Sequence, residues 1–182
     1  MSEFIAESTL ESIYVNIVVD TKYLKEQYPN PSKDYHHPTG INHNSQFMVV
    51  DNKHLVEKQG TADLVFKANS GDLVSFTGTS IEANSSDAVI VYGIKYWQGD
   101  KVFNDFFYYN RKTLEKAVMP SPNGNGLPPS QARISFMSLD SRVANSGTEH
   151  FYVYIAVYEQ SQSNSEQILY GYFYWDPSIT VK

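Results

Sequence analysis

Residues 151–158 read FYVYIAVY, a segment in which apolar side chains alternate with tyrosines. Successive side chains of an extended strand point to opposite faces, so this alternation gives one apolar face and one face rich in tyrosine. The apolar face consists of Phe151, Val153, Ile155 and Val157, and the other consists of Tyr152, Tyr154, Ala156 and Tyr158. The segment therefore predicts a β-strand whose apolar face packs on a hydrophobic core.

Residues 169–175, LYGYFYW, repeat this two-faced design. The polar linker EQSQSNSEQ, residues 159–167, lies between the two segments and is suited to close a long hairpin. Pairing of the two strands gathers six tyrosines on one surface. Two interpretations remain open. The tyrosines lie under the loop of residues 21–44 or across a two-fold interface, with their hydroxyls bonded to the backbone, or they form a platform that stacks sugar rings.

Short apolar or alternating segments recur along the rest of the chain. They comprise residues 13–20, 46–50, 64–66, 73–77, 88–97, 102–108 and 133–139. Turn sequences such as NSGD, residues 69–72, separate them at the spacing of an all-β fold. We expect an all-β, antiparallel two-sheet β-sandwich of jelly-roll type, built as a single domain over residues 1–182 with residues 1–12 frayed.

Two segments are longer than ordinary connections. Residues 21–44 contain three prolines, three histidines and three tyrosines, and residues 110–131 contain MPSPNGNGLPPS. Loops beyond about 12 to 15 residues usually either carry function or are disordered. We expect the first segment to be a packed, ordered loop because it is rich in aromatic groups. The second is expected to be a mobile flap, because proline and glycine exclude regular structure.

The charge and the composition of the chain restrict its partners and its location. The net charge is −6 and the chain has no cysteine. An acidic surface repels phosphate, so a nucleic acid partner is excluded. Residues 1–12 lack the basic and apolar regions of a signal peptide, and no apolar run approaches the roughly 20 residues that span a bilayer. We expect no membrane insertion and a cytoplasmic protein, held in inclusions or released without a classical signal.

Three long blocks of the chain resemble one bacterial family. They are residues 20–49 (DTKYLKEQYPNPSKDYHHPTGINHNSQFMV), 67–81 (KANSGDLVSFTGTSI) and 171–181 (GYFYWDPSITV). In this order they resemble the AidA/PixA family of bacterial inclusion-body proteins, and the likeness covers nearly the whole chain. The resemblance implies a β-sandwich, storage in cytoplasmic crystalline inclusions for some members, and no established enzymatic activity.

A second resemblance, fainter than the first, points to a calcium site. Residues 70–80, SGDLVSFTGTS, are similar to the opening strand of the calcium-dependent galactophilic jelly-roll lectins. In that type a carbonyl twelve residues after the aspartate binds calcium, and one loop near the C-terminus supplies the other ligands. The same offsets reach Asn84, Glu159, Ser163, Glu166 and Gln167 in this chain. Each of these residues offers an oxygen atom, the donor that Ca²⁺ prefers.

A bound Ca²⁺ ion would explain how an acidic protein recognises a neutral sugar. The ion accepts two adjacent sugar hydroxyls, while nearby carboxylate and amide oxygens accept hydrogen bonds from them. The candidate sugar-binding residues are Asn84, Ser85, Asp87, Tyr158 and Asn164, with Tyr158 as an apolar wall. The structural alternative is that residues 84–87 form an ordinary hairpin turn, in which Asn, Ser and Asp are common.

No catalytic motif stands out in the sequence. It contains neither a nucleophile elbow nor a glycine-rich phosphate loop, and the histidines of residues 21–44 lack the spacing of a zinc site. We therefore expect no enzymatic activity. The main hypothesis is a carbohydrate-binding protein, a lectin that recognises a monosaccharide or glycan terminus with calcium. The alternative is a cytoplasmic inclusion-body or storage protein without a ligand. The tyrosine surface favours a homodimer or a higher homo-oligomer.

Overall fold

The computed structural model describes residues 10–106 and 108–182, and nearly all of its regular structure is β. The elements in chain order are β1 (Ser12–Val19), α1 (Thr21–Gln27), β2 (Thr39–Gly40), β3 (Gln46–Val49), β4 (Leu55–Glu57), β5 (Leu64–Phe66), β6 (Leu73–Ser80), β7 (Ala88–Gly99), β8 (Tyr108–Met119), β9 (Ser130–Arg142), β10 (Gly147–Gln160), β11 (Gln167–Trp175) and β12 (Ser178–Val181). No helix among these elements has the length and hydropathy that crossing a membrane requires.

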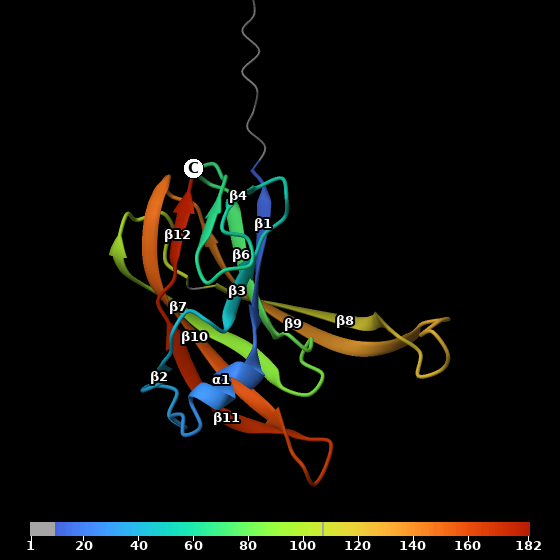
Figure 1. Ribbon diagram of the computed structural model, residues 1–182. Helices are drawn as coiled ribbons and strands as arrows, with labels where there is room; N and C mark the ends of the chain where they lie inside the picture. Colours follow the sequence, from blue (N-terminus) through green and yellow to red (C-terminus); the bar gives the residue numbers. More distant parts are fainter. Residues whose placement is uncertain (1–9, 107) are drawn as a thin grey trace, which may run out of the picture.

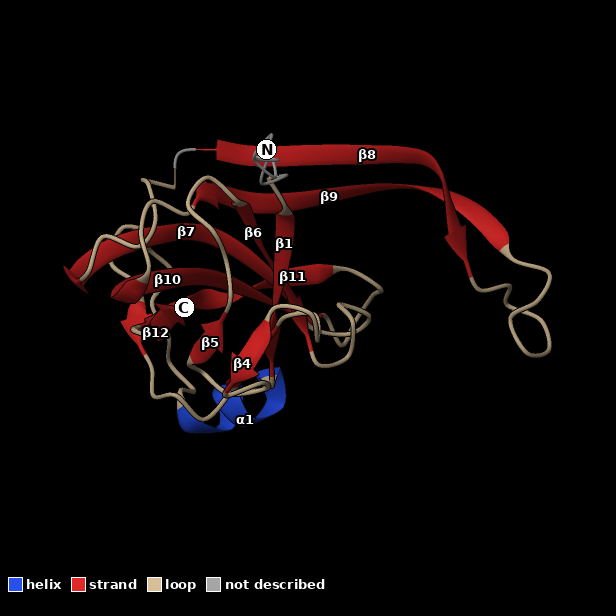
Figure 2. Ribbon diagram, turned by 90° about the horizontal axis from the view of Figure 1, so that it is seen from above, coloured by secondary structure: helices blue, strands red, loops and turns tan. Residues whose placement is uncertain are grey.

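The strands form two sheets that pack against each other (Figures 1 and 2). The first sheet has the order β3-β1-β6-β9-β8, and the second has the order β2-β11-β10-β12-β5-β4 with β7 paired to β10. The expected all-β two-sheet sandwich is confirmed. The pairing is mixed rather than purely antiparallel, because β1–β6, β11–β2 and β12–β5 are parallel pairs.

Strand β10 pairs with three other strands of the second sheet. Its first residues pair with β12, its later residues pair with β11, and its other edge pairs with β7 over most of its length. The predicted hairpin between residues 151–158 and 169–175 is therefore present as β10 and β11. A register shift between Val157 and Tyr158 marks a bulge near the end of the pair.

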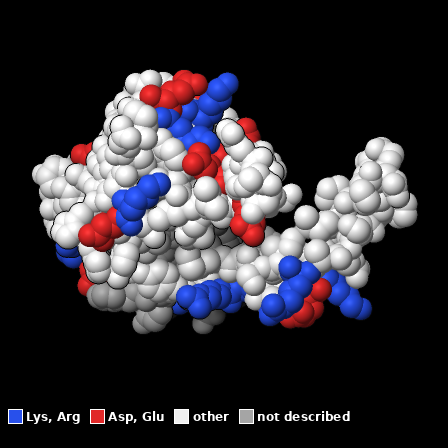
Figure 3. Space-filling view, turned by 90° about the horizontal axis from the view of Figure 1, so that it is seen from below, with Lys and Arg blue, Asp and Glu red and all other residues white. Residues whose placement is uncertain are grey.

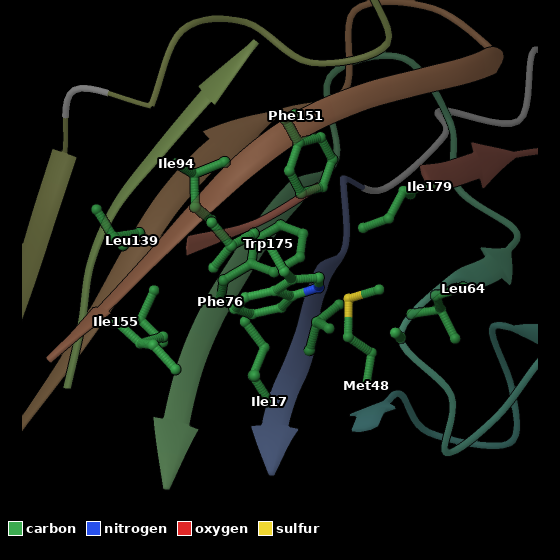
Figure 4. Close-up of a cluster of buried hydrophobic side chains, with 14 of the residues drawn as sticks. Ile17, Met48, Leu64, Phe76, Ile94, Leu139, Phe151, Ile155, Trp175 and Ile179 are labelled. Carbon is green, nitrogen blue, oxygen red and sulfur yellow. The ribbon is translucent and has the colours of Figure 1, made fainter. Parts of the chain in front are cut away.

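The apolar faces of both sheets share one core, drawn in Figure 4. Phe151, Ile155 and Trp175 come from the second sheet, while Ile17 and Phe76 come from the first, and all five are fully buried. Phe151 and Ile155 are residues that the period-two pattern placed on the apolar face of their strand. Burying large aliphatic and aromatic side chains between two sheets supplies most of the driving force for this fold.

Residues 21–44, expected to be a loop, begin with helix α1. Asp20 caps the helix, since its side chain accepts a hydrogen bond from the Tyr23 amide at 3.0 Å. Leu24 anchors the helix in the core. In the rest of the segment, Tyr28 packs against the core and Ile41 is buried, whereas most of the other residues are exposed, so the expected packing is only partly present. The segment adds the short strand β2 to the edge of the second sheet.

Residues 110–131, expected to be a flap, belong mostly to a β-ribbon. β8 runs to Met119 and β9 starts at Ser130, so the proline- and glycine-rich connection spans only residues 120–129. Of the strand expected over residues 102–108, residues 102–106 form no strand, since Phe103 makes only an isolated bridge to Val143, residue 107 lies outside the described part of the chain, and Tyr108 begins β8. Of the segment expected to fray, residues 1–9 lie outside the described part of the chain, and Ser12 already belongs to β1.

Candidate functional site

The two loops that carry the predicted site lie side by side. The Gln167 side chain at the start of β11 donates hydrogen bonds from Nε2 to the carbonyls of Asn84, at 3.0 Å, and Ser86, at 2.9 Å. The pairing of Ala88 with Tyr158 in β7 and β10 places the loops that flank these residues at one end of the sandwich. The offsets that suggested a shared site therefore correctly placed the two loops together.

Asn84 closes the loop between β6 and β7. Its φ of 59° lies in the left-handed region, which Asn tolerates better than most residues. Its side-chain oxygen accepts hydrogen bonds from the amides of Ser80 at 2.8 Å and Val89 at 2.9 Å. The hydroxyl of Ser85 donates to the Glu82 carbonyl at 2.6 Å. Both side chains thus stabilise the turn, as expected if residues 84–87 form an ordinary hairpin turn.

A lysine occupies the centre between the two loops. Nζ of Lys25, in the last turn of α1, lies 2.8 Å from Oδ2 of Asp87 and 3.5 Å from Oε2 of Glu159. Asp87 is buried, and Lys25 provides its carboxylate with a partner of opposite charge. Sequence reasoning did not predict this contact, because Lys25 and Asp87 are 62 residues apart.

The electrostatics of this cluster favour the charged lysine. Burial lowers the pKa of Lys25, but the hydrogen bond and charge of Asp87, together with Glu159, outweigh burial and raise it. Lys25 therefore carries its positive charge across the physiological pH range. Its ammonium neutralises one of the two carboxylates that it contacts.

The remaining predicted site residues lie at the exposed tip of the hairpin or beside it. Ser163 pairs its hydroxyl with that of Ser161 at 3.0 Å, and the side-chain oxygen of Asn164 accepts from the Glu166 amide at 3.2 Å. The Glu166 carbonyl accepts from the Ser161 amide at 2.8 Å, which closes the turn. Tyr158 is half-buried on β10. Within residues 10–106 and 108–182, no three His, Cys, Asp or Glu side chains gather as a metal site would require. The expected Ca²⁺ ion stays a prediction.

The tyrosine face is partly covered by the segment that precedes β2. The Tyr170 hydroxyl donates to the Tyr28 carbonyl at 2.8 Å, and the ring of Tyr35 packs edge-on against Tyr172. Pro31 lies so close to Gly171 that a Cβ built there would meet the proline ring at 2.4 Å. The interpretation that the tyrosines lie under the first long loop is confirmed for Tyr172. Tyr170 instead packs against the core, where its ring stacks on Phe173 at the bulge, so it does not join the tyrosine surface as expected.

The other half of the tyrosine face lines an open hollow of about 430 Å³ with His36, His37 and Pro38. Tyr152, Tyr154 and Tyr174 contribute its aromatic wall, and Trp97 stacks on Tyr152 with the ring centroids 5.8 Å apart. These rings contact one another on the sheet surface. Their mutual packing accounts for the aromatic richness of the two strands.

A larger hollow, of about 850 Å³, lies where β8 and β9 leave the sandwich. Its buried acid, Asp140, accepts hydrogen bonds from the Asn110 side chain at 3.1 Å and the Ser138 hydroxyl at 2.7 Å. The sequence did not point to this hollow, because its lining comes from segments that pair only in the folded chain. Its acid is satisfied by neutral donors.

Comparisons with known proteins identify the relatives of this chain. A family model described as PixA, inclusion body protein, matches residues 11–181. The crystal structure of an inclusion body protein (PixA) from Burkholderia cenocepacia J2315 superposes with a TM-score of 0.76 and 29% sequence identity, covering 97% of this chain and 99% of that one. No curated protein matches the chain.

These findings correct the main functional hypothesis. The expected lectin with a carbohydrate partner is wrong, because the family model and the similar structure both describe inclusion body proteins and neither names a sugar. The expected homodimer or higher homo-oligomer has no support from them. The resemblance to PixA is confirmed. With a family match over 171 of its 182 residues, the chain belongs to the PixA family of inclusion body proteins.

Proposed function

We propose that this chain is an inclusion-body or storage protein that accumulates in the folded state in the cytoplasm, without a ligand and without catalysing a reaction. The observation that carries the proposal is the PixA family match over residues 11–181, together with a similar structure that also bears the description of an inclusion body protein. The family description names a type of assembly rather than a reaction.

The buried acidic groups favour a structural role over catalysis. The carboxylate of Asp72 accepts from the amides of Glu11 at 2.9 Å and Asn69 at 2.7 Å, which ties the start of β1 to the turn before β6. Glu149 accepts from the amides of Val102 and Phe103 at 2.7 and 2.8 Å. With Asp87 on Lys25 and Asp140 on Asn110, each buried carboxylate named here has a partner from the fold.

Glu149 illustrates this role. Burial raises the pKa of its carboxyl, while the two amide hydrogen bonds act in the opposite direction. A raised carboxyl pKa is also a property of general acids. Here the same oxygen, Oε2, accepts both amide hydrogen bonds and fixes residues 102 and 103 beside β10. We assign Glu149 to folding.

The test is to produce the chain in bacterial cells and to recover any bodies that form. We expect microscopy to show bodies in the cytoplasm, and we expect them to redissolve in buffer without denaturant and to show the circular dichroism of a β-protein. The matched control is Phe173→Ala, which removes a buried aromatic side chain and costs about 3 to 5 kcal/mol. Bodies of this variant should need denaturant, because they contain misfolded chains.

Two results would contradict the proposal. One is a parent chain that stays dissolved at every level of production. The other is a parent chain whose bodies resist native buffer in the same way as those of Phe173→Ala, since this would mean that they consist of misfolded protein.

A further inference from the structure

Strands β8 and β9 form a ribbon that extends away from the sandwich (Figure 2). β6 pairs with β9 only over Leu139–Arg142, so beyond that point β9 has β8 as its only neighbour. We call residues 109–138 the arm. Among these residues Ala117 alone is buried. At its base the arm still contacts the body, since Thr77 donates to the Met137 carbonyl at 3.3 Å and the Tyr109 hydroxyl donates to the Tyr92 carbonyl at 3.2 Å. Beyond this base the arm presents both faces and both strand edges to the surroundings of the molecule.

Apolar side chains are conspicuous on the arm. The exposed large hydrophobic residues of the arm are Tyr109, Leu114, Val118, Leu127 and Phe136. Val118 is 70% exposed and Leu127, in the connection at the tip, is 65% exposed. A two-stranded ribbon is only marginally stable in water, and open strand edges pair readily with other chains. These features are typical of a segment that is covered by a partner.

The charge of the arm is opposite to that of the rest of the chain. The arm contains Arg111, Lys112, Lys116 and Arg133 but only one acid, Glu115, which gives it a charge of +3. Because the whole chain carries −6, the remainder carries −9. In Figure 3, Lys and Arg side chains with acidic side chains between them lie near the base of the part that projects from the body, and the end of this part shows no charged side chain in that view. A basic apolar arm on an acidic body is complementary to the body of another copy.

We propose that the arm is the contact element of the inclusion, docking on the acidic body of a second copy of this chain. This inference rests on the proposed function and names the surface that joins the molecules. The contact is heterologous, because the arm of one molecule meets the body of the next. Heterologous contacts that do not close into a ring propagate from copy to copy, which is the geometry that a growing body needs.

The test compares two triple variants with the same net charge. The arm variant is R111E/K112E/K116E, and the control is K22E/K67E/K95E, which reverses three exposed lysines outside the arm. Purified proteins are concentrated while light scattering is followed, and circular dichroism with thermal unfolding confirms that each is folded. We expect the arm variant to need about tenfold more protein than the control before scattering begins, since several exposed charge pairs are reversed at each contact.

Two further measurements sharpen the test. V118S/L127S leaves the charge unchanged and removes two exposed apolar groups of the arm, and we expect it to assemble less than the parent as well. A labelled arm variant mixed with the parent should enter the parent's bodies, because its acidic body still receives arms. An arm-to-arm contact would exclude it instead.

The outcomes separate this inference from the proposed function. A parent that forms no native bodies contradicts the proposed function. A parent that forms them while the arm variant matches the control contradicts the role of the arm, and exclusion of the labelled arm variant contradicts the arm-to-body contact.

Discussion

Replacing Lys25 by methionine tests the interaction that joins α1 to the two loops at the end of the sandwich. Met keeps the length of the side chain and has a similar helix propensity, so the change removes mainly the charge. The Lys25 and Asp87 side chains are 27% and 12% exposed, which places the pair between a surface ion pair and a buried one. Surface pairs contribute about 0 to 1 kcal/mol, and breaking a buried pair costs about 3 to 5 kcal/mol.

We therefore expect Lys25→Met to lower the free energy of unfolding by about 2 kcal/mol, which corresponds to a fall in Tm of roughly 4 to 8 °C for a chain of this size. Urea unfolding followed by tryptophan fluorescence measures the free energy, because Trp175 lies in the core. The control is Lys22→Met, an exposed lysine of the same helix, for which a change within about 0.5 kcal/mol is expected.

A double-mutant cycle with Asp87→Asn isolates the pair. If the contact is real, the double variant should be more stable than the sum of the two single changes predicts, by about 1 kcal/mol or more, because the second change removes a carboxylate that no longer has a cation. Additive changes, or equal effects of Lys25→Met and Lys22→Met, would refute the reasoning about this cluster.

Three further predictions follow from the same cluster and from the tyrosine face. The pKa of Lys25 is raised in the folded state, so its charged form stabilises the fold below the unfolded pKa of about 10.4, and this stabilisation is lost as the pH rises. Burial raises the pKa of Tyr92 to about 12, so the fold also loses stability when tyrosines of the unfolded chain ionise above about pH 10. The urea midpoint should therefore fall steadily above about pH 10, and less steeply for Lys25→Met. Gly171→Ala should lower the free energy of unfolding by about 1 to 3 kcal/mol in the same urea assay, because the new Cβ meets the Pro31 ring. Adding Pro31→Ala should restore part of this free energy. An unchanged free energy in Gly171→Ala would mean that the segment around Pro31 does not pack there. In calorimetry, the predicted Ca²⁺ ion has to compete with the Lys25 ammonium, so uptake should be stronger in Lys25→Met than in the parent, and equal uptake would place the ion elsewhere.

Local periodicity predicted the sandwich well where strands are buried on one face. Residues 151–158 and 169–175 alternate strictly, and they form the paired strands β10 and β11. Alternation does not report pairing direction, so the parallel pair of β1 and β6 was missed, since their first positions, Ser12 and Leu73, lie 61 residues apart. Helix α1 was missed because its seven residues are too few to show a helical period, although Asp20 ahead of Thr21 is an ordinary capping signal.

In the arm, the strand expected over residues 133–139 is present within β9, but β8 was missed for a different reason. Neither face of β8 meets the core along the arm, so the alternation that identifies a half-buried strand is absent there. The proline- and glycine-rich stretch MPSPNGNGLPPS then led to a predicted loop that was too long, because it included the neighbouring strand residues. A ribbon that is covered only by another molecule leaves little pattern in its own sequence.

The predicted calcium site shows which part of a resemblance transfers to a new chain. Spacing from Asp72 and from Glu159 correctly brought two loops together, because position along paired strands is set by the backbone. The chemistry at that place depends on a third element, and α1 brings an ammonium 2.8 Å from Asp87. An ammonium donates its hydrogen bonds to carboxylates, whereas Ca²⁺ needs six to eight oxygen ligands and keeps positions open for sugar hydroxyls. A lysine at this point stabilises the loops through Asp87 and Glu159, so a Ca²⁺ ion at the predicted place would have to displace its ammonium.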